Sequence, residues 1–392
     1  MTRTAPHLAT LVLLTALTVL TLNMFLPALP AMQEAFGVSE QVIGQSISLY
    51  MAAAAVLQLI LGPLSDRIGR RPVILGMLVI YVVASILCLL ATDITVFLIA
   101  RTAQAVAVGG GILSSAIVRD LYEGRGAAAK LSLIASAMAV APMLAPMVGG
   151  AMEAAFGWNS IFMAYAGLGA ALLLWCWRDL GETKASGGIA ARGVSQLLGS
   201  ALFWSYVGVQ ALGVGVFYIF LTGAPFVMVE FFGLGSAQTG LVLGSTTAGF
   251  LVGAGVSARI VERLGGMRLI LFGRMLPVIG ICAAWVYFAG GGVALWPLLC
   301  ATLCVGFGNG LSIPSSAAGA LSVQPELAGS ASGLSGAAVL AMGAGLTAMA
   351  TAVVGAQTTP ATLLAVMGLV ALGALASAGA ARMLDKDVPA RG

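Results

Sequence analysis

Two arginines, Arg101 and Arg274, lie inside long apolar stretches of the chain. A charged side chain within a membrane span costs several kcal/mol unless it faces a cavity or a partner. Arg101 follows Asp93 by eight residues, which places it roughly 12 Å into a helix at 1.5 Å per residue. A guanidinium at that depth reaches the membrane surface poorly. We therefore predict that Arg101 is an organising cation of an internal cavity.

Carboxylates, in contrast, are expected only near the ends of the apolar stretches. None of the 14 acidic residues falls at the centre of a predicted span. Asn23 precedes Pro30 by seven residues, roughly 10 Å of helix, and so is expected at nearly the depth of Arg101. Its amide forms hydrogen bonds but does not titrate near neutral pH. Asn23 is predicted to be a neutral partner or a ligand contact, or alternatively to cap a kink before Pro27.

Membrane-spanning helices must position these side chains. Of the 392 residues, 60% are hydrophobic and 8% are charged. So few charged residues cannot cover the surface of a water-soluble protein of this size. The charges are clumped, and the apolar stretches between them run to about 20 residues, enough to cross a hydrocarbon core of about 30 Å. The alternation typical of a membrane β-barrel is missing. We predict an all-α membrane protein with twelve spans, near residues 8–29, 42–63, 72–91, 94–116, 130–151, 159–178, 200–229, 237–258, 268–288, 294–316, 328–353 and 361–382.

The lysines and arginines predict the orientation of these spans. Apart from Arg101 and Arg274, the other 16 of the 18 basic residues all fall in alternate connections, and the opposite connections have none. Because basic loops stay inside, both termini are expected in the cytoplasm. A stretch of mixed charge, glycine and serine near the middle predicts a cytoplasmic linker. The predicted domains are a six-helix bundle over residues 1–178, a linker over 179–199 and a second six-helix bundle over 200–392.

A short internal repeat supports two related halves. The sequence DRIG at residues 66–69 is echoed by ERLG at residues 262–265, which lies 196 residues later, or half the chain. Both copies are expected between the second and third helix of their half. A duplicated architecture follows from this placement.

A motif of glycines and charges, GPLSDRIGRRP, fills residues 62–72 between the second and third predicted spans. Gly62 and Gly69 are expected to allow a tight reversal, and Pro72 suits the first turn of a helix. Asp66 is expected near a helix N-terminus or as an acceptor from an arginine. A loop that only sets topology is the alternative, although topology requires neither aspartate nor glycine.

This motif resembles the loop signature of the major facilitator superfamily. The resemblance implies two bundles that rock about a central substrate path, and a cytoplasmic latch between them. In that latch Asp66 would pair with Arg119 and face the start of helix eleven near Gly329.

Two further stretches are similar to motifs of the same family. RTAQAVAVGGG at residues 101–111 resembles the motif whose arginine is linked to proton coupling. APMLAPMVGG at residues 141–150 resembles the motif of drug and metabolite exporters, with Ala145 where glycine is commonest. Prolines and a glycine pair favour a bend between the halves, or else a kink with packing value only. The residues expected to serve coupling or gating are Arg101, Asp66, Arg67, Arg70, Arg119, Asp120, Pro146, Gly149 and Gly150.

Closer matches point to the Bcr/CflA branch of the drug:proton antiporters, named for bicyclomycin and chloramphenicol resistance. They are residues 25–30 (FLPALP), 58–71, 119–122 (RDLY) and 329–332 (GSAS). The branch usually has an aspartate in helix one, where this chain has Asn23. Any coupled proton is therefore expected to pass through the substrate or a peripheral acid: Glu34, Glu153 or Glu230.

By the same resemblance, a cavity lies between helices one, four, seven and ten. Its candidate substrate-binding residues are Asn23, Phe25, Tyr50, Arg101, Gln104, Gln210, Phe217, Tyr218 and Asn309. Aromatic side chains favour apolar or aromatic ligands, although each aromatic residue could instead face lipid.

We therefore expect a proton-linked secondary transporter that exports small amphiphilic compounds, including drugs, by alternating access. The alternative is a carrier of the same fold for a siderophore, an amino acid or a sugar. An intramembrane enzyme is disfavoured because the spans lack acids, histidine and a paired nucleophile and base. We expect a monomer in the lipid bilayer of the bacterial inner membrane, with a small-molecule substrate, no cofactor, no metal and no nucleic-acid partner.

Overall fold

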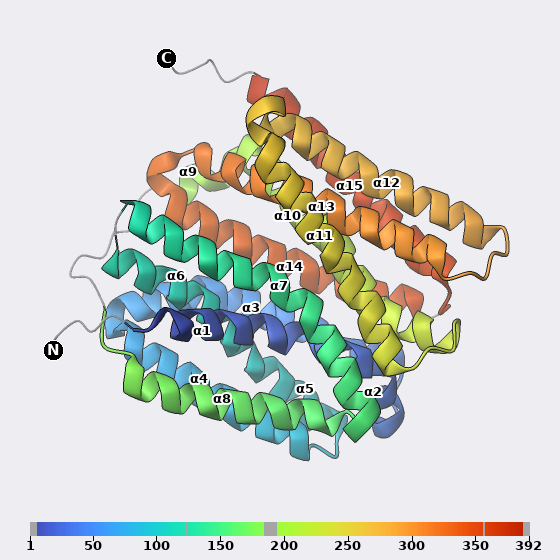
Figure 1. The fold of residues 1–392 in the computed structure, drawn as a ribbon, viewed down its shortest axis with the longest axis horizontal. Coiled ribbons are helices and arrows are strands. Elements are labelled where there is room, and N and C mark those ends of the chain that lie inside the picture. Colours follow the sequence, from blue (N-terminus) through green and yellow to red (C-terminus); the bar gives the residue numbers. More distant parts are fainter. Residues whose placement is uncertain (1–5, 123, 184–193, 356, 387–392) are drawn as a thin grey trace. The chain divides into compact units, whose positions relative to one another are not determined.

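The computed structural model describes residues 6–122, 124–183, 194–355 and 357–386, and within them the chain is helical without a strand. Figure 1 shows the long helices that make up the fold. The chain divides into two compact units, which are described separately below. The first unit consists of Met1–Ala190 with Gly235–Leu241, and the second consists of Ala191–Leu234 with Val242–Gly392.

The first unit contains α1 to α8. Its elements are α1 (Leu8–Asn23), η1 (Leu26–Ala28), α2 (Leu29–Phe36), α3 (Glu40–Ile68), α4 (Arg70–Leu90), α5 (Ile94–Ala103), η2 (Gln104–Val108), α6 (Gly109–Leu121), α7 (Gly124–Phe156) and α8 (Asn159–Asp179). α1 packs against α6, α7 and α8, and α8 lies alongside α4 (Figure 1).

The second unit contains the remaining long helices. Its elements are α9 (Val194–Leu198), α10 (Ala201–Glu230), most of α11 (Ser236–Leu264), α12 (Gly266–Ala289), α13 (Trp296–Ser322), η3 (Pro325–Leu327), α14 (Ala328–Val354) and α15 (Pro360–Lys386). The start of α11, up to Leu241, belongs to the first unit. α10 packs against α13, α14 and α15, and α12 packs against α13 and α15.

Eleven segments of the described chain are long and apolar enough to cross a membrane. They coincide with eleven of the predicted spans, so the all-helical, multi-pass class is confirmed. The remaining predicted span, 130–151, lies within α7, which is 33 residues long. The count of twelve spans and the cytoplasmic placement of the termini stay predictions.

Two spans that the hydropathy pattern predicts as continuous are interrupted. α1 ends at Asn23, and a 3-10 turn with Pro27 precedes α2. Because Pro27 has no backbone N–H, interrupting the helix at this point loses fewer helical hydrogen bonds than an interruption elsewhere in the span would. The fourth predicted span also contains a 3-10 turn, η2, directly before three glycines. A Cβ on Gly110 would lie 2.1 Å from the carbonyl oxygen of Leu14, so glycine is needed where α6 meets α1.

The chain reverses at one glycine of the 62–72 motif, not at both Gly62 and Gly69 as the sequence predicts. Gly62 is helical within α3, and Asp66 lies in the last turn of α3 rather than near a helix N-terminus. Gly69 alone makes the turn, with φ of 109°, a backbone conformation that other residues rarely adopt. Its counterpart in the second copy of the repeat, Gly265, has φ of 80° between α11 and α12. The two copies therefore share the glycine-based reversal.

Candidate functional site

The side chain of Arg101 is completely buried in the first unit. Its Nη2 donates to the carbonyl oxygen of Thr21, and its Nη1 donates to Oε1 of Gln104, both at 2.6 Å. Because α1 ends two residues after Thr21, the carbonyls of this last turn are open to donors from side chains. Tyr165 uses the same turn, donating to the carbonyl oxygens of Leu20 at 3.0 Å and Thr21 at 3.2 Å.

Two aromatic rings lie against the Arg101 guanidinium. Its Cζ atom is 4.0 Å from the centre of the Phe25 ring and 4.7 Å from that of Tyr50. The faces of aromatic rings attract cations, more strongly where water is excluded. The break after Asn23 brings Phe25 into this position, and α3 supplies Tyr50. The positive charge is thus held by rings and by neutral oxygens.

A second layer of hydrogen bonds fixes these partners. Nε2 of Gln104 donates to Oγ of Ser85 at 2.8 Å, and Ser85 donates to the Tyr81 carbonyl oxygen at 2.7 Å. The hydroxyls of Tyr81 and Thr21 lie 2.9 Å apart. The network therefore joins α1, α4, α5 with η2, and α8. Tyr81, Ser85, Thr21 and Tyr165 escaped the sequence analysis because a hydroxyl in an apolar helix has no distinguishing pattern.

Three buried atoms around this cluster lack a hydrogen-bond partner: Nε of Arg101, Oη of Tyr50 and Oδ1 of Asn23. Asn23 donates from Nδ2 to the Val19 carbonyl oxygen at 2.8 Å, and no hydrogen bond to Arg101 is formed. The ion pairs seen among the described residues include His7 with Asp179 and Arg70 with Asp66 and Asp120, and none of them involves Arg101. Arg101 therefore has no carboxylate partner. A buried donor and acceptors without partners are suited to a ligand with both polar and aromatic groups.

The candidates in the second unit lie on α10 and α13. Asn309 donates from Nδ2 to the Gly213 carbonyl oxygen at 3.1 Å. Gly213 lies about one helical turn after Gln210 on α10. The rings of Phe217 and Tyr218 are 5.9 Å apart, and both side chains are partly buried. Gln210 is buried, with Nε2 3.4 Å from the Tyr206 carbonyl oxygen.

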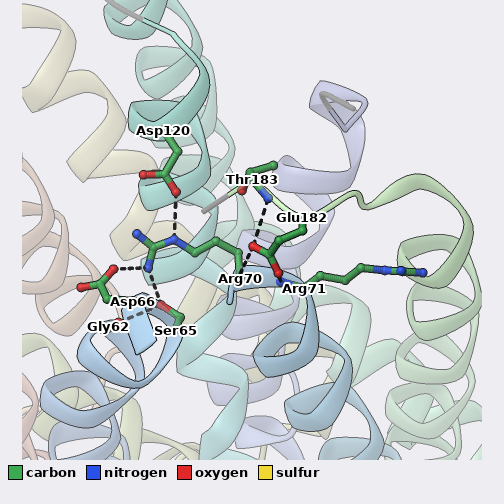
Figure 2. Close-up of polar contacts among 8 residues, drawn as sticks. All are labelled: Gly62, Ser65, Asp66, Arg70, Arg71, Asp120, Glu182 and Thr183. Atoms are coloured by element: carbon green, nitrogen blue, oxygen red, sulfur yellow. Dashed lines mark hydrogen bonds and ion pairs between the residues drawn. The ribbon is translucent and has the colours of Figure 1, made fainter. Parts of the chain in front are cut away.

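Arg70 is the centre of a charged network at the ends of α3, α4 and α6 (Figure 2). Its Nε donates to Oδ2 of Asp120 at 2.9 Å, and its Nη1 lies 2.6 Å from Oδ1 of Asp66. Nη1 also donates to Oγ of Ser65. The side chains of Arg70 and Asp120 are only 10% and 12% exposed, whereas that of Asp66 is 50% exposed.

This network differs from the expected pair of Asp66 and Arg119. The turn at Gly69 places Arg70 beside the last turn of α3, so Asp66 pairs with Arg70 instead. Arg119 is exposed, and its neighbour Asp120 takes the place facing Arg70. Arg67 is exposed as well.

Glu182 caps the start of α4, a contact that sequence reasoning missed. Its Oε1 accepts from the backbone N–H of Arg70 at 2.9 Å and of Thr183 at 3.0 Å, and its Oε2 accepts from that of Arg71 at 3.4 Å (Figure 2). An acid at a helix N-terminus satisfies free N–H groups and offsets the helix dipole. A Cβ on Gly69 would lie 2.3 Å from Oε2 of Glu182. The only signal in the sequence is an acid at the start of the polar stretch after α8.

The proline–glycine motif of α7 provides a close contact with α1. Pro146 lies within the helix, and Pro146, Gly149 and Gly150 are buried. A Cβ on Gly149 would lie 1.6 Å from the carbonyl oxygen of Met24. The glycine therefore lets α7 approach the backbone at the break after α1.

Long apolar helices, and an arginine buried among their backbone carbonyls, define a multi-pass helical membrane protein. Residues 11–346 match the model of the Major Facilitator Superfamily, and the chain belongs to this family of membrane transporters. Family and fold are those of transporters rather than enzymes, and the resemblance seen in the motifs is confirmed.

Its relatives include drug-resistance proteins. The chain is 33% identical over 258 residues to a chloramphenicol resistance protein of Pseudomonas aeruginosa, covering 64% of this chain and 61% of that protein. It is 28% identical over 319 residues to the multidrug resistance protein MdtL of Escherichia coli O9:H4 (strain HS), covering 80% and 81% of the two chains.

Solved structures share the fold at low identity. A bacterial homologue of the human lysosomal transporter Spinster, in an inward-facing and occupied conformation, has a TM-score of 0.78 and 15% identity, covering 97% of this chain and 96% of its own. The human organic anion transporter TETRAN has a TM-score of 0.68 and 19% identity, covering 94% and 98%.

Proposed function

We propose that this protein exports small amphiphilic compounds, drugs among them, across the bacterial inner membrane by alternating access. The observation that carries the proposal is the Arg101 cluster, in which aromatic rings and unpartnered polar atoms lie side by side in a membrane span. A ligand with an aromatic body and a few polar groups matches this combination. The drug-resistance relatives support the same substrate class.

In this proposal the residues of the first unit hold the ligand through Asn23, Phe25 and Tyr50, while Arg101 and Gln104 keep the cluster in place. Gln210, Phe217, Tyr218 and Asn309 contribute from the second unit. The two six-helix bundles, residues 1–178 and 200–392, are joined by the linker at 179–199 and rock about a central substrate path, and the protein acts as a monomer.

The Arg70 network belongs to the cytoplasmic gate in this scheme. Arg70 holds Asp66 and Asp120 together in the first unit, and its release would loosen the ends of α3 and α6. Arg67 and Arg119 are exposed beside it. In this scheme Arg119 offers its charge to lipid head groups or to other parts of the gate, and Arg67 adds to the positive charge of the gate. Pro146, Gly149 and Gly150 provide the bend in α7.

In this proposal, proton coupling does not use an acid of helix one, where the Bcr/CflA branch usually has an aspartate and this chain has Asn23. Arg101 has no carboxylate partner, and Asn23 does not titrate near neutral pH. The peripheral acids Glu34, Glu153 and Glu230 lie near helix ends, and they or the substrate would take the proton.

Drug accumulation in bacteria lacking their own exporters tests the proposal. Cells that produce the protein should accumulate less chloramphenicol or cationic dye than cells that produce an equal amount of the Arg101→Ala variant. A thermal-shift screen of the purified protein against drugs, siderophores and amino acids identifies the ligand class, because a ligand of the folded state raises the melting temperature. Equal accumulation in both strains, together with stabilisation by a metabolite alone, would refute drug export.

A further inference from the structure

A second arginine is buried inside the second unit. Arg274 is 3% exposed and lies eight residues after Gly266, the first residue of α12, roughly 12 Å along the helix. Its Nη2 donates to Oγ of Ser312 on α13. Its guanidinium lies against α10, where a Cβ on Gly213 would be 1.7 Å from Nη1. Any larger residue at position 213 would exclude the side chain of Arg274.

The backbones around Arg274 are also packed tightly. A Cβ on Gly273 would lie 2.6 Å from the carbonyl oxygen of Gly308, and one on Gly308 would lie 2.3 Å from that of Gly273. α12 and α13 therefore touch through a reciprocal glycine pair, immediately beside the point where Arg274 leaves its helix. The guanidinium is held in place by helices of a single unit.

Arg274 is compensated far less well than Arg101. Arg101 has two neutral acceptors and two aromatic rings. Within the part of the chain that the structure describes, the only hydrogen bond of Arg274 is with the Ser312 hydroxyl, and no aromatic ring lies over its guanidinium.

No carboxylate of the second unit's described residues compensates the charge either. These acids are all exposed and lie at or near helix ends: Glu230, Glu262, Glu326 and Asp385. A buried cation without a counter-charge is unfavourable in a membrane span. A negative charge bound next to Arg274 would therefore be stabilised by its guanidinium.

Two unused polar atoms face the same small space. Nε of Arg274 and Oδ1 of Asn309 are both buried without a partner, and both residues line a narrow space between α10, α12, α13 and α15. The rest of the lining is apolar and includes Val216, Pro277 and Ala371. The space leaves no room for a water molecule, so a ligand enters by displacing side chains of the lining.

We propose that Arg274 and Asn309 form a binding site for a small anion inside the second unit. The ligand is a single negative charge of small radius, either a free halide or the carboxylate head of a larger molecule. It accepts from Nε of Arg274 and offsets the buried charge. Where the anion is the carboxylate head of a larger molecule, a hydroxyl or N–H group of that molecule donates to Oδ1 of Asn309. This site is separate from the Arg101 cluster. It shares Asn309 with the proposed substrate contacts of the second unit, but anion binding is measured without drug transport, so the two proposals can fail separately.

Anion-dependent stability of the purified full-length protein tests this site. The protein is placed in nanodiscs of zwitterionic lipid, and sodium methanesulfonate, whose anion is neither a halide nor a carboxylate, is replaced stepwise by sodium bromide or sodium benzoate at constant ionic strength. The wild-type melting temperature should rise by a few degrees and reach a plateau, as expected for binding to the folded state. A response to bromide identifies a free anion, whereas a response to benzoate alone identifies a carboxylate head group.

Variants connect the response to the proposed residues. Arg274→Gln should abolish it, while Arg268→Gln, which removes an exposed charge from the same helix, should keep it. Asn309→Asp supplies an internal carboxylate, so this variant should be more stable than wild type in methanesulfonate and respond to neither bromide nor benzoate. The proposal is overturned if wild type shows no saturable response, or if Asn309→Asp responds like wild type; the latter comparison stands even where Arg274→Gln does not fold.

Discussion

Cζ of Arg101 lies 4.0 Å from the centre of the Phe25 ring, although 76 positions separate the two residues in the chain. The contact exists because α1 stops at Asn23 and turns before α2. The same turn exposes the Thr21 carbonyl, which accepts from Arg101. One break in a helix thus creates both kinds of support for a buried charge.

Arg101→Lys should therefore behave almost like Arg101→Ala. An ammonium is a point charge and does not reproduce the planar fork that reaches Gln104 and Thr21 together. Each charge-assisted hydrogen bond lost costs about 2 kcal/mol, or about 30-fold in transport if it acts fully on the limiting step. Transport into proteoliposomes is the measurement, with membrane insertion checked for both variants. Wild-type transport by either variant would exclude an organising role.

Asp120→Asn should destabilise the protein more than Asp66→Asn. Asp120 forms a nearly buried ion pair with Arg70, whereas half of the Asp66 side chain is exposed. Losing one member of a buried pair costs about 3 kcal/mol, and losing an exposed pair costs less than about 1 kcal/mol. Chemical denaturation in detergent gives the comparison. A larger loss in the free energy of unfolding for Asp66→Asn than for Asp120→Asn would contradict this prediction.

Asp66→Asn should nevertheless shift the conformational equilibrium toward the inward-open state, because it removes one of the two negative charges that hold Arg70. The measurement is the labelling rate of a single cysteine in the cytoplasmic half of the proposed cavity, in a variant without the five native cysteines. The charge-preserving Asp66→Glu is the control. An unchanged rate in Asp66→Asn would remove Asp66 from the gate.

Gly69→Ala and Gly62→Ala should have opposite consequences, although both glycines belong to one motif. Gly69 has φ of 109°, and its Cβ would meet the Glu182 carboxylate. Gly62 is helical with open space around its Cβ, so alanine there should be neutral or stabilise by up to about 1 kcal/mol. Gly265→Ala separates the two causes, because φ at Gly265 is 80° and nothing lies within 4 Å of its Cβ. Melting temperatures should fall in the order Gly62→Ala, Gly265→Ala, Gly69→Ala.

Coupling to protons is tested by uptake into proteoliposomes with and without an imposed pH gradient. Asn23→Asp adds a titratable group to helix one and should increase the dependence on the gradient, because a carboxylate can carry the proton that an amide cannot. One of three variants, Glu34→Gln, Glu153→Gln or Glu230→Gln, should lose the dependence on the gradient. That variant identifies the acid that carries the proton in the wild-type protein. A strong gradient dependence that survives all three variants, with a substrate that carries no proton, would contradict coupling through a peripheral acid.

Much of the architecture is determined by local sequence. Apolar runs long enough to cross a bilayer identify the spans, since hydrophobic length is a property of neighbouring residues. The depth of Arg101 and the absence of acids from span centres follow in the same way, by counting along a helix. The break after Asn23 agrees with a kink before Pro27, which the sequence offers only as the alternative role of Asn23. The break at Gln104 is not predicted, because a 3-10 turn changes neither the hydropathy nor the length of a span.

The partners of each charge, in contrast, were decided only by the tertiary structure. Arg119, the expected partner of the 62–72 motif, and Asp120 are neighbours in the sequence, yet it is Asp120 that faces Arg70, while Arg119 is exposed. Glu182 reaches α4 from 112 positions away, and Arg274 meets a glycine of α10 that has no recognisable pattern. Such contacts depend on how helices distant in the chain pack together, and composition and spacing along one helix carry no information on that packing.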